Sequence, residues 1–197
     1  MTLRTLLFAA LAAATASAGA LAADAPQLYT KHSVVVNATP KADYLGRLDA
    51  VTPVTVVKRE GKMALVQIDG WALAEYPSQI FKAPGVRIER ASFDEESAVR
   101  LNKSAGEKTV QGNVWVRAFA RGWLPADALT SDLEGLWKAG RARLNDACSS
   151  CHGAPKADHF TANQWASQLP VRGGRTGHTR RGANEVMFRY LQEHARQ

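Results

Sequence analysis

The sequence has 197 residues, of which 25 are lysine or arginine and 18 are aspartate or glutamate, and its formal net charge is +7 at pH 7. This length accommodates two small domains but is short for one large enzyme core, and the composition is that of an ordinary globular protein. Only two cysteines are present, so a zinc site built from two separated cysteine pairs is excluded.

Residues 1–22 have the pattern of a cleavable export signal. Arg4 precedes an apolar run over residues 6–11, and Ala20-Leu21-Ala22 has the small-x-small pattern that signal peptidase requires. We expect cleavage after Ala22, a periplasmic location and no transmembrane anchor in the mature chain; an uncleaved anchor is the alternative. Cleavage lowers the net charge to about +6. For an exported protein, scattered basic residues favour an acidic protein partner over nucleic acid.

Short β-strands are predicted from residue 27 to about residue 129. Val66 and Ile68 alternate with Gln67 and Asp69, as a half-buried strand requires. Turn chemistry separates β-branched or aromatic runs in two sets, which divide at Ala83-Pro84-Gly85. The predicted strands are residue 29 and residues 33–36, 44–48, 53–57 and 65–68 in the first set, and residues 86–93, 98–101 and 114–120 in the second.

Each set contains an alternating strand that ends in Gly-Trp, at Gly70-Trp71 and at Gly122-Trp123. This ending resembles bacterial SH3-like domains, and the resemblance implies small β-barrels over residues 24–82 and 83–130. Whether the second segment is its own barrel or an extension of the first is open. We expect Trp71, Trp115 and Trp123 to be core residues rather than an aromatic platform for a peptide or glycan.

The composition changes at Ser131, after which helices are predicted. Residues 131–134 form a capping box with Ser131 as N-cap, so a helix should run from about residue 132 into the cysteine motif described below. A second capping box at residues 161–164 opens a short helix through Trp165 and Leu169. Residues 170–182 are predicted to be a loop. A last helix over residues 184–195 places Met187, Tyr190, Leu191 and His194 on one face, and Trp137 packs either on that helix or on a cofactor edge.

Cys148-Ser149-Ser150-Cys151-His152 has the spacing of a c-type haem attachment site. In such a site Cys148 and Cys151 bind the porphyrin covalently, and the His152 imidazole is the proximal ligand of the iron. We therefore predict one covalently bound haem c. A redox-active disulfide and a zinc site are the alternatives, but the first lacks its usual strand and helix context, and the second lacks further cysteines.

The distal iron ligand is not determined by spacing. His178 is the first candidate, because the loop before the closing helix is expected to cross the far face of the ring; His159 is the second and Met187 the third. His194 and an open site are further alternatives. Four arginines follow the motif within the predicted loop and are candidates for contacts with haem propionates or with a partner: Arg172, Arg175, Arg180 and Arg181.

The C-terminal third resembles the haem domain at the C-terminus of the TorC-type cytochromes. The resemblance runs from about Ser131 to the end and rests on residues 148–152, on His159-Phe160-Thr161-Ala162-Asn163-Gln164-Trp165 and on residues 190–195. Those cytochromes pass electrons from membrane quinol to periplasmic molybdenum reductases of trimethylamine N-oxide and related S- or N-oxides, and they carry four further haems. The resemblance implies a one-haem protein that relays electrons to, or docks on, a periplasmic oxidoreductase.

The expected architecture is therefore multidomain, with an all-β SH3-like barrel region followed by an all-α cytochrome c-like haem domain over residues 131–197. The expected function is electron transfer to, or docking on, a periplasmic oxidoreductase, namely a molybdenum S- or N-oxide reductase. The expected partner is that reductase or a membrane quinol-oxidising cytochrome. The alternative is a binding or regulatory module that recognises a reductase without being its main electron donor. We do not expect an enzyme, since a peroxidase needs an open iron site and distal acid–base groups.

Overall fold

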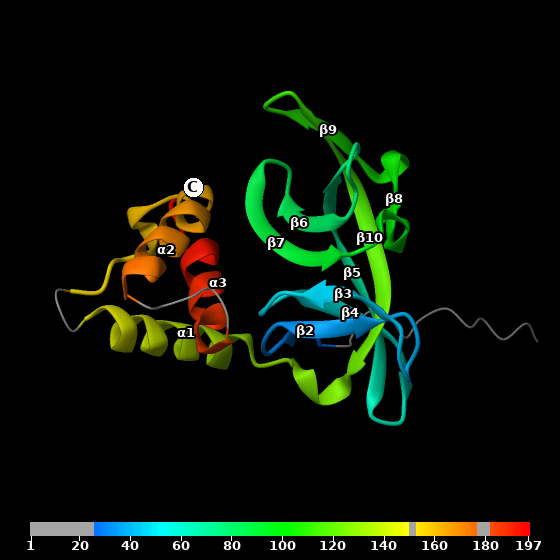
Figure 1. The fold of residues 1–197 in the computed structure, drawn as a ribbon, viewed down its shortest axis with the longest axis horizontal. Helices are drawn as coiled ribbons and strands as arrows, with labels where there is room; N and C mark the ends of the chain where they lie inside the picture. The colour runs from blue at the N-terminus through cyan, green and yellow to red at the C-terminus, as the bar shows by residue number, and fades with distance from the viewer. Residues whose placement is uncertain (1–25, 150–152, 177–181) are drawn as a thin grey trace, which may run out of the picture.

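The computed structural model describes residues 26–149, 153–176 and 182–197. The predicted export signal, Cys151, His152 and His178 lie outside these residues. The described chain forms a six-stranded antiparallel β-barrel with extra strands, followed by three helices that pack to one side of it (Figure 1). No helix in these residues is long and apolar enough to cross a membrane.

The barrel is closed by strands from both predicted sets. Its order is β5, β6, β7, β3, β2 and β10, and β10 returns to β5. The remaining strands extend the sheet, with β1, β4 and β11 on one side and β8 and β9 along β10. The strands are β1 (Leu28–Thr30), β2 (Val34–Asn37), β3 (Tyr44–Leu48), β4 (Pro53–Glu60), β5 (Met63–Leu73), β6 (Gln79–Ala83), β7 (Val86–Phe93), β8 (Val99–Leu101), β9 (Glu107–Val110), β10 (Asn113–Pro125) and β11 (Leu129–Thr130).

The pairing of β5 with β10 joins the two strand sets. It runs in register from Trp115 opposite Leu73 to Pro125 opposite Met63. The strands of both sets therefore lie in one barrel, which is the arrangement expected if the second segment extends the first. The predicted domain limits at residues 82 and 130 stay a prediction.

Alternation along β5 and β10 explains the barrel core. Val66 and Ile68 on β5, and Ala118 and Ala120 on β10, are almost fully buried and belong to one apolar cluster inside the barrel. Trp71, Trp115 and Trp123 are each 8% exposed, so they are buried as predicted, but they do not belong to the apolar cluster inside the barrel. They occupy the other face of the same strands, because residues of odd number on β10 alternate with the inward alanines.

The helices are α1 (Leu133–Cys148), α2 (Ala162–Thr176) and α3 (Glu185–Glu193). The predicted N-cap of α1 is wrong by one residue: Asp132, not Ser131, caps the helix, and its Oδ1 accepts a hydrogen bond from the Gly135 N–H at 2.8 Å. A carboxylate oxygen at residue 132 accepts a hydrogen bond from a backbone N–H of the first turn, as the hydroxyl of a serine N-cap would.

The capping box of α2 is confirmed. The Thr161 N–H donates to Gln164 Oε1 at 2.9 Å, and the Gln164 N–H donates to Thr161 Oγ1 at 3.2 Å. The end of this helix is not where the sequence predicts it: α2 continues through Pro170 to Thr176, so Arg172 and Arg175 are helical rather than in a loop. Arg180 and Arg181 lie outside the described residues.

Candidate haem attachment site and the cleft between barrel and helices

Cys148 is the last residue of α1, and its half-buried side chain packs against the apolar cluster of the helices. This cluster is built from all three helices and is separate from the barrel core. Its buried members are Leu144, Trp165, Met187, Phe188, Tyr190 and Leu191, and Trp137, Ala147, Ala154, Ala157, Phe160, Leu169 and Ala195 pack against it.

This environment fits a porphyrin at the first cysteine. A haem needs an apolar wall next to its thioether bonds, and the cluster against which Cys148 packs contains alanine, leucine and aromatic side chains. The other two members of the motif, Cys151 and His152, lie outside the described residues. In the part of the chain that the structure covers, no group of three His, Cys, Asp or Glu side chains is placed to hold a metal ion.

The candidates for the distal ligand lie in different environments. Met187 is 2% exposed and belongs to the same apolar cluster as Cys148. His159 is exposed in a short 3-10 helix, Ala157–His159, and its ring contacts Phe160 edge-on, with centroids 4.5 Å apart. Of the three ranked candidates only Met187 is therefore placed in the cluster by the described residues.

His194 and Trp137 form an aromatic group at the barrel side of the helices. Their rings meet edge-on with centroids 5.1 Å apart, and Tyr190 lies 4.4 Å from His194 and 6.3 Å from Trp137. The backbone carbonyl of Tyr190 lies 2.9 Å from His194 Nδ1. Trp137 thus packs on the last helix, which confirms the first of its two predicted roles.

α1 leads away from the barrel toward Cys148 (Figure 1). Leu133 and Trp137 near its start line a cleft against the barrel. The helix has 16 residues, which corresponds to a length of about 24 Å. The attachment cysteine is therefore held at the end of the helical segment that is remote from the barrel.

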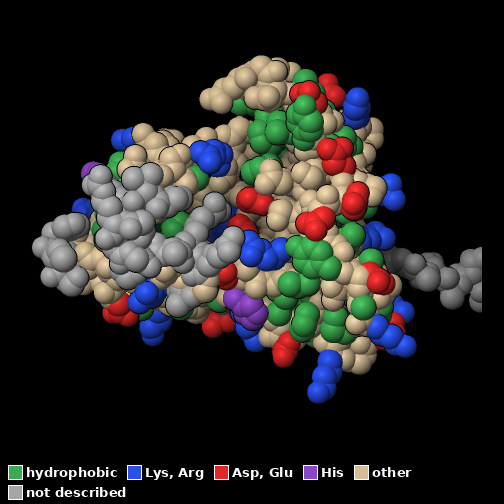
Figure 2. Space-filling model, in the orientation of Figure 1, with side chains coloured by type: hydrophobic (Ala, Val, Ile, Leu, Met, Phe, Trp, Pro, Cys, Tyr) green, Lys and Arg blue, Asp and Glu red, His purple; other side chains and the backbone are tan. Residues whose placement is uncertain are grey.

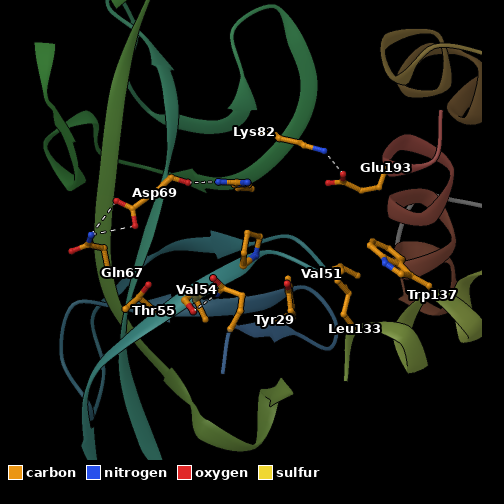
Figure 3. A pocket seen from close by; sticks show the side chains of 13 residues that line it. Tyr29, Val51, Val54, Thr55, Gln67, Asp69, Lys82, Leu133, Trp137 and Glu193 are labelled. Carbon is orange, nitrogen blue, oxygen red and sulfur yellow. Dashed lines mark hydrogen bonds and ion pairs between the residues drawn. The ribbon is translucent and has the colours of Figure 1, made fainter. Parts of the chain in front are cut away.

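The cleft between barrel and helices has a volume of about 410 Å³. Tyr29, Val51 and Val54 line it from the barrel, while Leu133 and Trp137 face them from α1 (Figure 3). Side chains of both charges gather where the helices meet the barrel (Figure 2). Lys82 at the end of β6 forms an ion pair with Glu193 on α3 across this boundary.

Arg90 also lines the cleft, together with Asp69. Its Nη1 donates a hydrogen bond of 2.6 Å to the backbone carbonyl of Asp69. Burial lowers the pKa of Arg90, while the nearby carboxylates of Glu193 and Asp69 oppose this shift and Arg117 adds to it. An arginine starts so far above neutral pH that it stays protonated, so the cleft keeps a fixed positive charge.

The helices are fixed to the barrel by a buried arginine that the sequence did not single out. Arg189 on α3 is 4% exposed. Its Nε donates a hydrogen bond to the Ala50 carbonyl at 3.1 Å. Its Nη2 lies 3.4 Å from Asp49 Oδ2 and donates a hydrogen bond to the Glu89 carbonyl. A charged residue between Phe188 and Tyr190, inside an apolar helical stripe, was the signal available in the sequence.

Further hydrogen bonds join the two parts. Gln192 Nε2 donates to the Arg87 carbonyl at 2.8 Å, and the Arg87 N–H donates to Asn163 Oδ1 at 2.7 Å. The Ser33 N–H donates to Glu185 Oε2 at 2.8 Å. These bonds place α2 and α3 against β7 and the loop before β2, so the barrel determines how the helical segment is held.

The described residues form a β-barrel joined to three helices, and the first helix ends at the first cysteine of a Cys-x-x-Cys-His sequence, which has the spacing predicted for haem c attachment. The family comparison agrees: the chain belongs to the family described as the TorC third cytochrome c domain, whose profile matches residues 9–129. This match ends before α1. The family is therefore confirmed, while the predicted resemblance from Ser131 onward to the TorC haem domain stays a prediction.

The curated relatives are cytochrome c-type proteins. The chain is 29% identical over 154 residues to cytochrome c-type protein TorC of Escherichia coli K12, which is 76% of this chain and 39% of that protein. It is 29% identical over 160 residues to cytochrome c-type protein TorY of Escherichia coli O157:H7, which is 79% of this chain and 43% of that protein. It is 27% identical over 141 residues to TorY of Haemophilus influenzae, which is 71% of this chain and 38% of that protein. The chain thus spans less than half of these relatives. No solved structure matches it.

Proposed function

We propose that this chain is a periplasmic, one-haem c-type electron-transfer protein that delivers electrons to a reductase. The observation that carries the proposal is the Cys-x-x-Cys-His sequence that begins at the last residue of α1, with Cys148 packed against an apolar cluster. The relatives support it, because they are cytochrome c-type proteins. The same relation supports electron transfer rather than enzymatic turnover.

The residues of this chain have distinct roles in the proposal. Cys148 and Cys151 hold one haem c, and His152 is the proximal ligand. When bound, the haem supplies reversible one-electron chemistry of its iron. The apolar cluster excludes water beside Cys148, and the barrel holds the helices through Arg189 and Gln192.

The partner class comes from the resemblance to the TorC-type cytochromes. It is a periplasmic oxidoreductase, specifically a molybdenum reductase of S- or N-oxides, with a membrane quinol-oxidising cytochrome as the electron source. Because α1 carries Cys148 away from the barrel, we infer that such a partner reaches the attachment end of the helices without displacing the barrel.

The test is the absorption spectrum of protein exported in a host that matures c-type cytochromes. We expect sharp bands after dithionite reduction and haem that stays bound after denaturation. His152→Ala should abolish the low-spin spectrum, whereas the matched control His32→Ala, in the loop before β2, should leave it unchanged. Protein without covalent haem would refute the proposal.

The distal ligand is tested on the same material. A weak charge-transfer band at the red end of the oxidised spectrum would assign Met187, and its loss in Met187→Leu with the fold intact would confirm that assignment. If the band is absent, His178→Ala and His159→Ala distinguish the two histidines, because only removal of the true ligand changes the low-spin spectrum.

A further inference from the structure

The outward face of β10 alternates aromatic and basic side chains. Inward residues of this strand, such as Ala118 and Ala120, are buried in the barrel core. The outward positions, which include two exposed arginines and a half-buried phenylalanine, are Trp115, Arg117, Phe119, Arg121 and Trp123. Neighbouring strands add Lys58, Arg100, Lys108 and Trp71. We name this set the arginine-aromatic face.

Its cations lie over its rings. The Arg117 guanidinium is 4.8 Å from the centroid of Trp71, the residue opposite it in the β5–β10 pairing. Lys108 is 5.8 Å from the same ring, Arg121 is 5.9 Å from Phe119, and Lys58 is 5.7 Å from Trp123. Stacking covers the rings and restricts the cations, so less side-chain entropy is lost when an anion binds them.

A hollow of about 620 Å³ opens on this face. Phe119 and Leu101 contribute apolar surface to its lining, together with Leu45. Arg100, which pairs directly opposite Phe119, and Arg121 also line it, and both are exposed. The hollow therefore offers an apolar contact between two guanidinium groups.

Positive charge exceeds negative charge here. The five cations of the face are Lys58, Arg100, Lys108, Arg117 and Arg121. The carboxylates of Glu60 and Asp69 adjoin them: Glu60 pairs with Lys58 at 3.1 Å, and Asp69, opposite Phe119, accepts hydrogen bonds from Gln67. Gln67 also accepts a bond of 2.9 Å from Arg121 Nε, which fixes that side chain over the sheet.

The spacing of the arginines matches an extended polypeptide. Outward residues of a strand repeat about every 6.8 Å, and one face of an extended peptide has the same repeat. Arg117 and Arg121 are two such repeats apart, with Phe119 between them. An acidic peptide laid along β10 can therefore place carboxylates on the arginines and an apolar side chain in the hollow.

We propose that the arginine-aromatic face binds an extended, acidic segment of a partner protein. This function needs no haem, because every contributing residue belongs to the β-sheet and none to the helices. The face adjoins the cleft through Gln67 and Asp69 and continues across β10 to β8, on a part of the molecule separate from Cys148. This chain therefore recognises such a partner through a surface other than the one that carries Cys148.

The test uses the full chain and a short synthetic peptide in which glutamate and valine alternate, with binding measured by calorimetry at low salt. We expect Arg117→Ala/Arg121→Ala to weaken binding by about tenfold or more, and Arg100→Ala, a single change at the hollow, to weaken it less. The matched control Lys41→Ala/Lys138→Ala removes the same charge from exposed residues elsewhere and should stay within about twofold.

Several results would overturn the proposal. The first is that the unaltered chain does not bind the peptide. The second is that Arg117→Ala/Arg121→Ala binds the peptide as tightly as the control variant does. The third is that the unaltered chain binds a peptide with glutamine in place of glutamate as tightly as the glutamate peptide. Stronger arginine-dependent binding of heparin oligosaccharides or of phosphatidylglycerol vesicles would assign the face to another polyanion and would equally refute an acidic protein segment. An unchanged haem spectrum in each variant shows that the attachment site is intact.

Discussion

The buried indoles of Trp165 and Trp115 differ in whether the ring N–H donates a hydrogen bond. Trp165 is 1% exposed and its Nε1 donates to the Ala157 carbonyl at 2.7 Å. Trp115 is 8% exposed, and its Nε1 has no hydrogen-bond partner among the described residues. Its ring is held instead by an edge-on contact with Phe81, with centroids 5.4 Å apart. Trp115 therefore bears a desolvation cost that Trp165 does not.

We predict that Trp165→Phe destabilises the protein more than Trp115→Phe does, by about 1 to 2 kcal/mol. Both changes remove similar ring volume, so the difference isolates the indole N–H. The free energy of unfolding is measured for each variant with denaturant, following the helices and the barrel separately. Equal losses would mean that the Trp165 bond contributes nothing, or that water satisfies Trp115.

Residue types and spacing predict part of the candidate site. The interval between Cys148, Cys151 and His152 is sufficient for the haem hypothesis, because the chemistry requires that interval. The distal ligand is different, since it depends on which loop crosses the haem and sequence spacing does not determine that path. Burial of Met187 was predicted from the apolar stripe of α3, whereas the exposure of His159 follows only from the placement of the helices.

At the scale of the elements, the repeated Gly-Trp dipeptide has a physical cause. Gly70 and Gly122 occupy positions whose side chains would face the inside of the barrel, and the tryptophan that follows each glycine faces outward. A Cβ on Gly70 would overlap the Phe81 carbonyl oxygen, and one on Gly122 would overlap a methyl group of Val36. The barrel is therefore narrow enough at these points that only glycine lets the neighbouring strands approach.

We predict that Gly70→Ala destabilises the barrel by about 1 to 3 kcal/mol, because the overlap is with backbone that cannot rotate away. Gly153→Ala is the matched control, since no atom of the described residues lies within 4 Å of the added Cβ. Thermal unfolding followed by tryptophan fluorescence gives the comparison. A Gly70→Ala barrel as stable as the control would contradict the close approach of β5 and β6.

The strands were more predictable than the helix ends. Alternation of apolar and polar residues gave the long strands, because one face of each is buried in the barrel. The prediction ended α2 near Leu169 because residues 170–182 are rich in glycine and arginine, yet the helix continues through Pro170 to Thr176. Closure of one barrel from two strand sets was left open, since pairing between β5 and β10 joins residues far apart in the sequence.

At the scale of the molecule, the barrel and the helices have separate cores and are joined by polar contacts. The apolar cluster inside the barrel and the cluster around Leu144 and Trp165 share no residue. Arg189 is the most buried link, with bonds to Asp49, Ala50 and Glu89, while Lys82–Glu193 is partly exposed. These links depend on the final docking of the two parts, so no local pattern predicts them.

We predict that Arg189→Ala costs about 2 to 4 kcal/mol of stability and uncouples the unfolding of the helices from that of the barrel. Removing the guanidinium leaves the buried Ala50 carbonyl and the partly buried Glu89 carbonyl without that donor. Lys82→Ala breaks an ion pair across the same boundary whose side chains are 42% and 22% exposed, so its cost should stay below about 1 kcal/mol.

The measurement is thermal unfolding followed by haem absorbance for the helices and by tryptophan fluorescence for the barrel, combined with limited proteolysis near Asp132. Arg189→Ala should separate the two transitions and expose the connection between β11 and α1 to protease, whereas Lys82→Ala should leave both transitions together. A single transition in Arg189→Ala at an unchanged temperature would mean that the remaining bonds, such as Gln192 to the Arg87 carbonyl, are enough to hold the helices on the barrel. Separation with an unchanged haem spectrum would show that the barrel orients the helical segment without forming the attachment site.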